Sequence, residues 1–180
     1  MSGHSKWSTI KHKKAAVDAK RGKEFSKLAK LIAVESKLCG GDESSPSLKT
    51  VIEKAKAANM PKDNIARAVA KGAGGDMGDT EKITYELYGP GGVAILVHTL
   101  TDNRNRTNQE LKHLVSKLGY QMAEPGAAAW AFTVENGVYT ATTTIPLSEE
   151  DTAAFETLVE ELLAHDDVDD VSTNEEEHVE

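Results

Sequence analysis

The sequence predicts an α+β protein: an N-terminal three-helix bundle with a basic arm, followed by a ferredoxin-like antiparallel sheet domain. Three observations support this fold class. Apolar residues recur at helical spacing as far as residue 71, alternation typical of strands begins after residue 80, and a glycine-rich segment, GAGGDMGDT at 72–80, separates the two patterns. We therefore divide the 180 residues into a basic helical nucleic-acid-binding domain at 1–75 and an α+β domain with an acidic C-terminus at 76–180.

The first domain is expected to begin with an extended arm, because residues 1–16 are basic and show little apolar periodicity. A helix is predicted from Asp18 to Leu38, where apolar residues follow the i, i+3, i+4, i+7 pattern and lysines form a stripe roughly opposite them. Two further helices are predicted after Ser45-Pro46 and from Pro61 to Gly72, because proline suits the first helical position.

The second domain is expected to have the order ββαββαβ, with both helices on one face of the sheet. The segment VAILVHTL at 93–100 is apolar on both faces, as in a central strand. Asn136-Gly137 predicts a hairpin between strands around Trp130–Phe132 and 138–143.

Side-chain caps mark the helices of this second domain. Thr107 with Glu110 forms a capping-box pattern at the start of the first helix, and Ser148 is expected to cap the second. A short strand at 168–171 follows, ahead of an acidic tail.

The composition excludes several classes of protein. No apolar run approaches the roughly 20 residues that span a bilayer, and no apolar segment follows the basic N-terminus as it would in a secretory signal. The chain has one cysteine, Cys39, so a disulfide framework and the common structural zinc sites are excluded. We expect a cytoplasmic protein without a membrane partner.

The net charge of −8 hides a strong separation of charge along the chain. Residues 1–71 contain 16 Lys and Arg against 7 Asp and Glu, residues 72–147 contain 5 against 8, and residues 148–180 contain none against 14. Because salt screens charges beyond about 10 Å, each region acts on a partner mainly through its own charge. The basic N-terminal region therefore predicts a nucleic-acid partner.

The main candidate binding residues lie in the arm and the first helix. Lysine suits phosphate as a flexible point charge, and a tryptophan in the arm suits stacking on an exposed base, at about 1–3 kcal/mol per base. A lysine-rich face that only meets water is the alternative, but the concentration of positive charge in one domain favours binding. These candidates are Lys6, Trp7, Lys11, Lys13, Lys14, Lys20, Arg21, Lys23 and Lys27.

A second candidate contact is the segment TDNRNRT at 101–107. Arg104 and Arg106 alternate with asparagines just before a predicted helix N-terminus, where free backbone N–H groups and the helix dipole suit a phosphate. Arginine adds bidentate contacts. The alternative is a loop that only caps its own helix through Asx turns, but capping does not require two arginines, so we favour the phosphate contact.

No set of residues predicts an enzyme. The histidines lack a metal-binding spacing, and the P-loop ending, the dinucleotide fingerprint and the G-x-S-x-G elbow are all missing from the sequence. The acidic run Glu149–Asp151 opens a helix, where acids suit the dipole. We expect no catalytic residues, no metal site, no cofactor and no small-molecule substrate.

Long strings of this sequence resemble the YebC family, also called YebC/PmpR, which includes the mitochondrial translational activator of cytochrome c oxidase. They are GHSKWSTIKHKKAAVDAKRGKEFSKL at 3–28, NMPKDNIARAVAKGAGG at 59–75, YELYGPGGVAILV at 85–97 and TDNRNRT at 101–107. The resemblance implies an N-terminal helical domain and a ferredoxin-like domain. It also implies that a further α/β domain, usually inserted after about residue 138, is absent from this short form, because Val138 runs closely into the final helix.

The resemblance implies a regulator of gene expression of one of two kinds: a ribosome-associated translation factor or a DNA-binding transcriptional regulator. The residues favour RNA over DNA, because a lysine-rich arm and a basic helix suit irregular RNA, while the alanine-rich third helix offers no base-reading face. Together with the resemblance, this makes ribosomal RNA and the ribosome the expected partners. Duplex DNA is the alternative, since an arm also fits a minor groove. A protein-interaction adaptor whose oppositely charged ends bind proteins is the alternative of another class.

Overall fold

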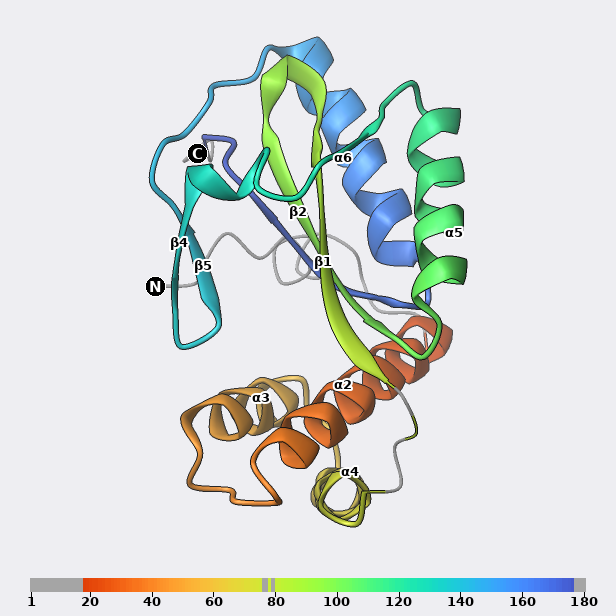
Figure 1. Ribbon diagram of the computed structural model, residues 1–180, viewed down its shortest axis with the longest axis vertical. Coiled ribbons are helices and arrows are strands. Elements are labelled where there is room, and N and C mark those ends of the chain that lie inside the picture. Colours follow the sequence, from red (N-terminus) through yellow and green to blue (C-terminus); the bar gives the residue numbers. More distant parts are fainter. Residues whose placement is uncertain (1–17, 76–77, 79, 177–180) are drawn as a thin grey trace. The chain divides into compact units, whose positions relative to one another are not determined.

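The computed structural model describes residues 18–75, 78 and 80–176, with side chains from residue 22 onward (Figure 1). These residues form two compact units, a helical unit that ends at Glu81 and a sheet unit that begins at Lys82. The boundary predicted at 75/76 lies in the segment that joins the last helix of the helical unit to the first strand. The α+β class predicted from the sequence is confirmed.

The helical unit contains three helices close to the predicted positions. The second and third begin where proline fixes the backbone angle φ, with Pro46 in the first turn of one helix and Pro61 as the N-cap of the next. The helices are α2 (Asp18–Leu38), α3 (Pro46–Ala57) and α4 (Lys62–Ala73). Helix α2 packs against both of the others, so it is the centre of this unit.

Helices α2 and α4 approach closely because Gly72 has no side chain. A Cβ atom added at Gly72 would lie 2.2 Å from the carbonyl oxygen of Ala33 and 2.9 Å from the amide nitrogen of Lys37. At the same contact the buried Ser36 hydroxyl donates a hydrogen bond to the carbonyl of Val69, at 2.7 Å. Glycine at this position therefore sets the distance between the two helices.

The sheet unit is built on a four-stranded sheet with the order β3-β1-β2-β6. Its strands are β1 (Glu81–Tyr88), β2 (Ala94–Thr101), β3 (Met122–Ala123) and β6 (Val168–Thr173). The β2–β6 and β1–β3 pairs are antiparallel, with Val97 opposite Val171 in the first pair. The two-residue strand β3 was not expected from the sequence.

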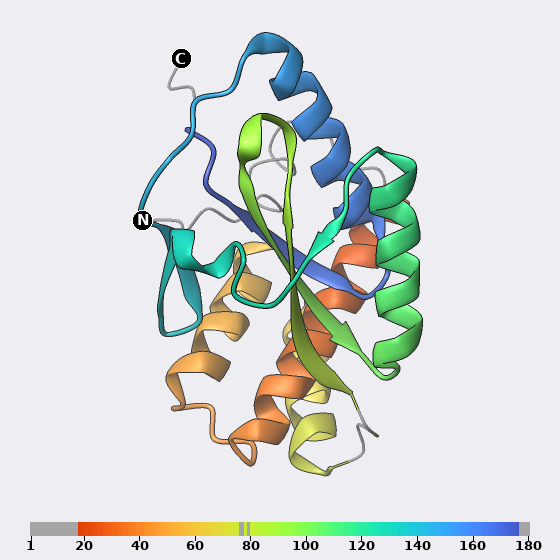
Figure 2. The same ribbon diagram turned by 45° about the horizontal axis from the view of Figure 1, so that its top comes forward.

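Strand β2 is buried on both faces, as its continuous apolar sequence predicted. Helices α5 (Arg104–Lys117) and α6 (Glu149–Ala164) lie side by side on one face (Figures 1 and 2). The core beneath them includes Ile95, Val97, Leu111, Val115, Leu158 and Leu162. A smaller core on the other face joins Ala94 and Leu96 to Ala128, Ala131 and Phe132.

The predicted hairpin is present, but the expectation that it belongs to the main sheet is wrong. Strands β4 (Phe132–Glu135) and β5 (Val138–Ala141) pair only with each other and form a separate two-stranded sheet. The turn residues Asn136 and Gly137 have φ angles of 51° and 78°, the left-handed region that an Asn-Gly turn favours. With β3, the order of the sheet unit is ββαβββαβ rather than ββαββαβ.

The predicted strand at Trp130–Phe132 is wrong at its start. Residues Ala129–Ala131 form a single 3-10 turn, and β4 begins only at Phe132. Trp130 is 61% exposed, and its indole Nε1 donates a hydrogen bond to the Tyr88 hydroxyl at 2.9 Å.

Glu86 explains why this segment turns. Its buried carboxylate accepts backbone hydrogen bonds from Gly126 at 2.6 Å, Ala128 at 2.7 Å and Ala129 at 2.9 Å. Burial raises the pKa of Glu86, but the three backbone hydrogen bonds together outweigh burial and hold the pKa below its usual value. The three N–H groups all point toward this one carboxylate, whereas in an extended strand successive N–H groups point in alternating directions. The hydrogen bonds to Glu86 therefore favour a turn over a strand in this segment.

The helix starts of the sheet unit are only partly as predicted. Ser148 caps α6, and its hydroxyl accepts from the Asp151 amide at 3.1 Å. The capping box at Thr107 and Glu110 is wrong, because α5 begins at Arg104 and its N-cap is Asn103. No helix in the described part of the chain combines the length and the apolarity needed to cross a membrane.

Candidate nucleic-acid interface

Most of the predicted arm contacts cannot be placed. Lys6, Trp7, Lys11, Lys13 and Lys14 lie outside the described residues. Lys20 and Arg21 belong to α2, but their side chains are outside the description as well. For these seven residues the binding role stays a prediction.

The lysine stripe of α2 is not a uniform solvent-facing surface. Lys23 and Lys37 are exposed, and the Lys37 ammonium group donates to the Gly78 carbonyl at 2.9 Å. Lys30 is half-buried, whereas Lys27 is only 7% exposed. Because α2 packs against two other helices, its lysines cannot all face solvent, and Lys27 is the least accessible of the described candidates.

Arg106 is held by two carboxylates. Its guanidinium nitrogen Nη2 lies 3.0 Å from an Asp102 carboxylate oxygen and 2.8 Å from Asp167 Oδ2. Asp167, reinforced by Asp102, raises the pKa of the Arg106 guanidinium. The Asn103 side chain accepts from the Arg106 amide at 3.0 Å and caps α5. The segment therefore caps its own helix and ties it to the start of β6. The phosphate contact of Arg104 and Arg106 stays a prediction. Arg104 is exposed.

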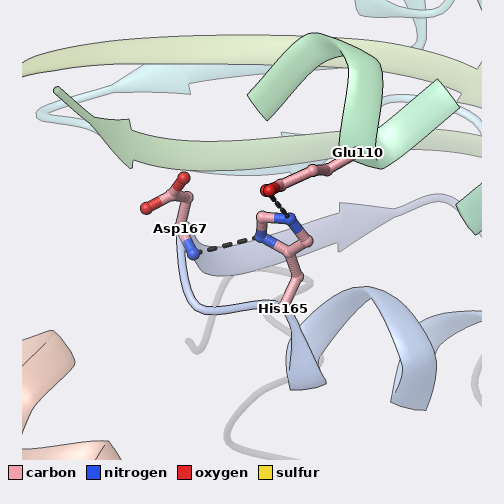
Figure 3. A group of neighbouring side chains, drawn as sticks. All are labelled: Glu110, His165 and Asp167. Carbon is pink, nitrogen blue, oxygen red and sulfur yellow. Dashed lines mark hydrogen bonds and ion pairs between the residues drawn. The ribbon is translucent and has the colours of Figure 1, made fainter. Parts of the chain in front are cut away.

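A cluster of possible metal ligands lies beside this loop (Figure 3). Glu110 comes from α5, and His165 and Asp167 come from the connection between α6 and β6; their candidate ligand atoms lie within 4.8 Å of one another. His165 Nδ1 accepts a hydrogen bond from the Asp167 backbone amide at 3.1 Å, which places the ring proton on Nε2, 3.0 Å from a Glu110 carboxylate oxygen.

The third member of this cluster is also engaged, because Asp167 Oδ2 lies 2.8 Å from both Arg106 Nη2 and the Thr107 hydroxyl. Protein hydrogen bonds thus occupy atoms that a cation would require. We conclude that the cluster is a structural network that joins α5 to β6.

A groove of about 600 Å³ lies between α2 and α4, within the helical unit. Its apolar floor includes Phe25, Ala33 and Ala68, and its basic side chains are Lys30, Arg67 and Lys71. Among the described residues that line it, none is acidic. The groove is therefore apolar inside and positively charged along α4.

Arg67 and Lys71 are exposed, and neither pairs with a carboxylate among the described residues. Within the described part of the chain, the Arg67 guanidinium donates to two neutral oxygens, the Asp63 carbonyl at 3.2 Å and the Asn64 side chain. Neither cation was predicted as a binding residue from the sequence, because each stands alone rather than in a lysine-rich string. The available signal was their i, i+4 spacing, at which two like charges on one helix face repel each other.

Two family models match this chain. The TACO1/YebC protein N-terminal domain matches residues 5–75, and the TACO1/YebC second and third domain matches residues 80–138. A probable transcriptional regulatory protein of Trichlorobacter lovleyi is 51% identical over 175 residues, which cover 96% of this chain and 70% of the relative. The chain belongs to the TACO1/YebC family.

Other similar proteins agree with the TACO1/YebC assignment. A probable transcriptional regulatory protein of Desulforamulus reducens is 48% identical over 177 residues, 96% of this chain and 73% of the relative. One from Citrifermentans bemidjiense is 57% identical over 134 residues, 73% of this chain and 54% of the relative. A crystal structure of a conserved hypothetical protein from Aquifex aeolicus has a TM-score of 0.79 and 33% identity, and covers 95% of this chain and 96% of that one.

These TACO1/YebC relatives are named as regulatory proteins rather than as enzymes. The second family model stops matching at residue 138, the position after which the sequence analysis expects a domain to be absent. That absence stays a prediction.

Proposed function

We propose that this TACO1/YebC chain is a non-enzymatic, nucleic-acid-binding regulator of gene expression, acting in the cytoplasm as a translation factor on ribosomal RNA. The observation that carries the proposal is the separation of charge, with 16 Lys and Arg against 7 acids in residues 1–71 and 14 acids without a basic residue in residues 148–180. Phosphate-dense RNA is attracted to the first region and repelled by the last.

In this proposal the N-terminal arm and the exposed part of α2 supply the main contacts, and Arg104 supplies a second one. RNA is favoured over DNA because α4 is rich in alanine, which makes up four of its twelve residues and offers no hydrogen-bonding group to base edges. Lysine contacts to phosphate suit an irregular RNA surface, which is recognised by shape.

Duplex DNA is the second candidate target, and the names of the relatives favour it, since they are called probable transcriptional regulatory proteins. This candidate requires a preferred DNA sequence that survives competition by bulk DNA. A protein-interaction adaptor is the third, and it requires complexes that nuclease treatment leaves intact.

Crosslinking in cells, followed by sequencing of the RNA and DNA recovered with the full chain, separates these candidates. Enrichment of one region of ribosomal RNA is the expected result. Discrete promoter DNA without ribosomal enrichment would overturn the translation role in favour of transcription. Recovery of neither nucleic acid, with protein complexes that resist nuclease, would overturn nucleic-acid binding itself.

A further inference from the structure

We propose that the groove between α2 and α4 binds one unstacked nucleotide of a single-stranded nucleic acid, with its phosphate on Arg67 and Lys71 and its base against Phe25. This inference rests on the proposed function and adds a site that neither the arm nor the 101–107 segment supplies. It is carried by three properties of the groove: its charge, its apolar floor and its size.

The charge of the groove selects an anion. Arg67 and Lys71 lie one helical turn apart on α4 and both line the groove, and no acidic side chain is found among its described lining residues. Arg67 already has its Nε and one terminal nitrogen on neutral oxygens, so its orientation is fixed without its charge being neutralised. A guanidinium held in this way, beside an ammonium group, suits one phosphate.

The floor of the groove selects an apolar ring. Ala33 and Ala68 are 1% and 5% exposed, and Phe25 is half-buried. Small side chains leave the space open, and an aromatic side chain gives a planar base a surface on which to stack. The volume of about 600 Å³ lies within the range of about 300–1,000 Å³ usual for sites that enclose a small ligand.

A groove that combines a phosphate contact with an apolar floor can distinguish a single-stranded nucleic acid from a duplex. In a duplex the bases are stacked inside and only the phosphates reach such a groove, so the floor would remain unused. In a single strand the base is available to stack on an aromatic side chain. We therefore expect the groove to favour single-stranded over duplex nucleic acid.

The test measures binding of a short fluorescein-labelled single-stranded RNA to the full-length chain by fluorescence anisotropy. The variant R67Q/K71Q removes both groove cations, and K49Q/K56Q is the matched control. Lys49 and Lys56 are exposed lysines of α3 outside the groove, and each pair of substitutions removes one cation from a last helical turn. We expect the groove variant to bind about tenfold more weakly and the control to change less than about twofold.

The base contact is tested with Phe25→Leu, which keeps an apolar side chain but removes the aromatic face. An RNA carrying 2-aminopurine, whose emission is quenched on stacking, should lose its binding-dependent quenching in this variant. Affinity for single-stranded RNA should fall about fivefold or more, while affinity for duplex RNA should hardly change. Circular dichroism melting curves of all variants establish that they are folded.

The outcomes separate this inference from the function on which it rests. If the wild-type chain binds neither RNA nor DNA, the proposed function fails and the groove site fails with it. If the wild type binds but both double variants weaken binding equally, only the groove site is overturned. An equal loss on duplex and single strands overturns the single-strand preference. Unchanged RNA affinity with lost binding of a polyglutamate peptide would instead assign the groove to an acidic protein segment.

Discussion

Glu86 is the residue on which the segment between β3 and β4 depends. A single carboxylate at 8% exposure satisfies the backbone N–H groups of three residues that lie about 40 positions further along the chain. Buried N–H groups without an acceptor are costly, so the carboxylate determines where the chain turns before the β4–β5 hairpin.

Replacing this carboxylate with an amide, Glu86→Gln, should destabilise the folded protein by about 2 kcal/mol at pH 7, because the amide nitrogen cannot accept the hydrogen bonds that the lost oxygen accepted. The difference should depend on pH. The folded pKa of Glu86 lies below its usual value of 4.5, so its contribution is fully present above pH 4.5 and is lost as the pH falls through the folded pKa.

Urea unfolding of the wild type and Glu86→Gln at pH 7 and at successively lower pH checks this, and the gap between the two proteins should narrow in acid. Glu135→Gln, which changes an exposed carboxylate of β4, is the control and should cost less than about 0.5 kcal/mol. A gap that stays constant through the acid range would show that the ionised form of Glu86 is not what holds the turn.

A substitution of Arg106 distinguishes a structural role of this residue from a nucleic-acid-binding role. Arg106→Gln removes an ion pair to Asp167, a buried carboxylate that also accepts a hydrogen bond from the Thr107 hydroxyl. We expect a lower midpoint of urea unfolding and less than about a twofold change in RNA affinity. Lys112→Gln, an exposed cation on the same helix, is the control for charge. If RNA binding weakened about tenfold while stability was unchanged, the result would instead support the phosphate contact that the sequence predicts for Arg106.

At the scale of the element, the contact between α2 and α4 depends on one missing Cβ. Gly72→Ala places a methyl group 2.2 Å from a backbone oxygen, so the helices must separate or Ala33 must shift. We expect a loss of about 2 kcal/mol or more in the free energy of unfolding, measured in urea. The control is Gly22→Ala, at an exposed position of α2 where an added Cβ meets nothing within 4 Å.

The control is expected to stabilise α2, by up to about 1 kcal/mol, because alanine favours a helix more than glycine does. Equal behaviour of the two variants would contradict the close packing of α2 on α4. It would also remove the support for the groove, whose shape depends on the distance between these helices.

The helices and turns that could be predicted from the sequence are those that depend on residues close together in the chain. The starts of α3, α4 and α6 were predicted because proline or serine at the helix start acts within a few residues. The Asn136-Gly137 turn was predicted for the same reason. By contrast, the 3-10 turn before β4 depends on Glu86, and the strand β3 is two residues long, too short for any periodicity.

The candidate site shows the same division. The sequence indicated the basic region by composition alone, but the engagement of Arg106 depends on Asp167, 61 residues away. The groove requires side chains from two helices to be brought together, so the i, i+4 spacing of Arg67 and Lys71 could not be assigned to a groove before the packing of α2 on α4 was known. Contacts between residues far apart in sequence cannot be predicted from the local residue pattern of one chain.

At the scale of the whole molecule, the separation of charge should make binding strongly dependent on salt despite a net charge of −8. If about five phosphates are neutralised, doubling the salt concentration should weaken single-stranded RNA binding about tenfold. Charge reversal in the arm, K13E/K14E, should weaken binding and flatten this dependence. Anisotropy titrations at several salt concentrations measure both slopes, and an unchanged slope in the variant would count against the arm.

Strand β2 links the two layers of the sheet unit. Its residues belong in alternation to the core under α5 and α6 and to the smaller core under the hairpin side. Because β2 contributes side chains to both cores, a loss of packing in one core also disturbs the strand on which the other core is packed. The β4–β5 side is thereby coupled to the helices across the sheet, and this unit should unfold cooperatively, rather than as a stable sheet with a detachable hairpin.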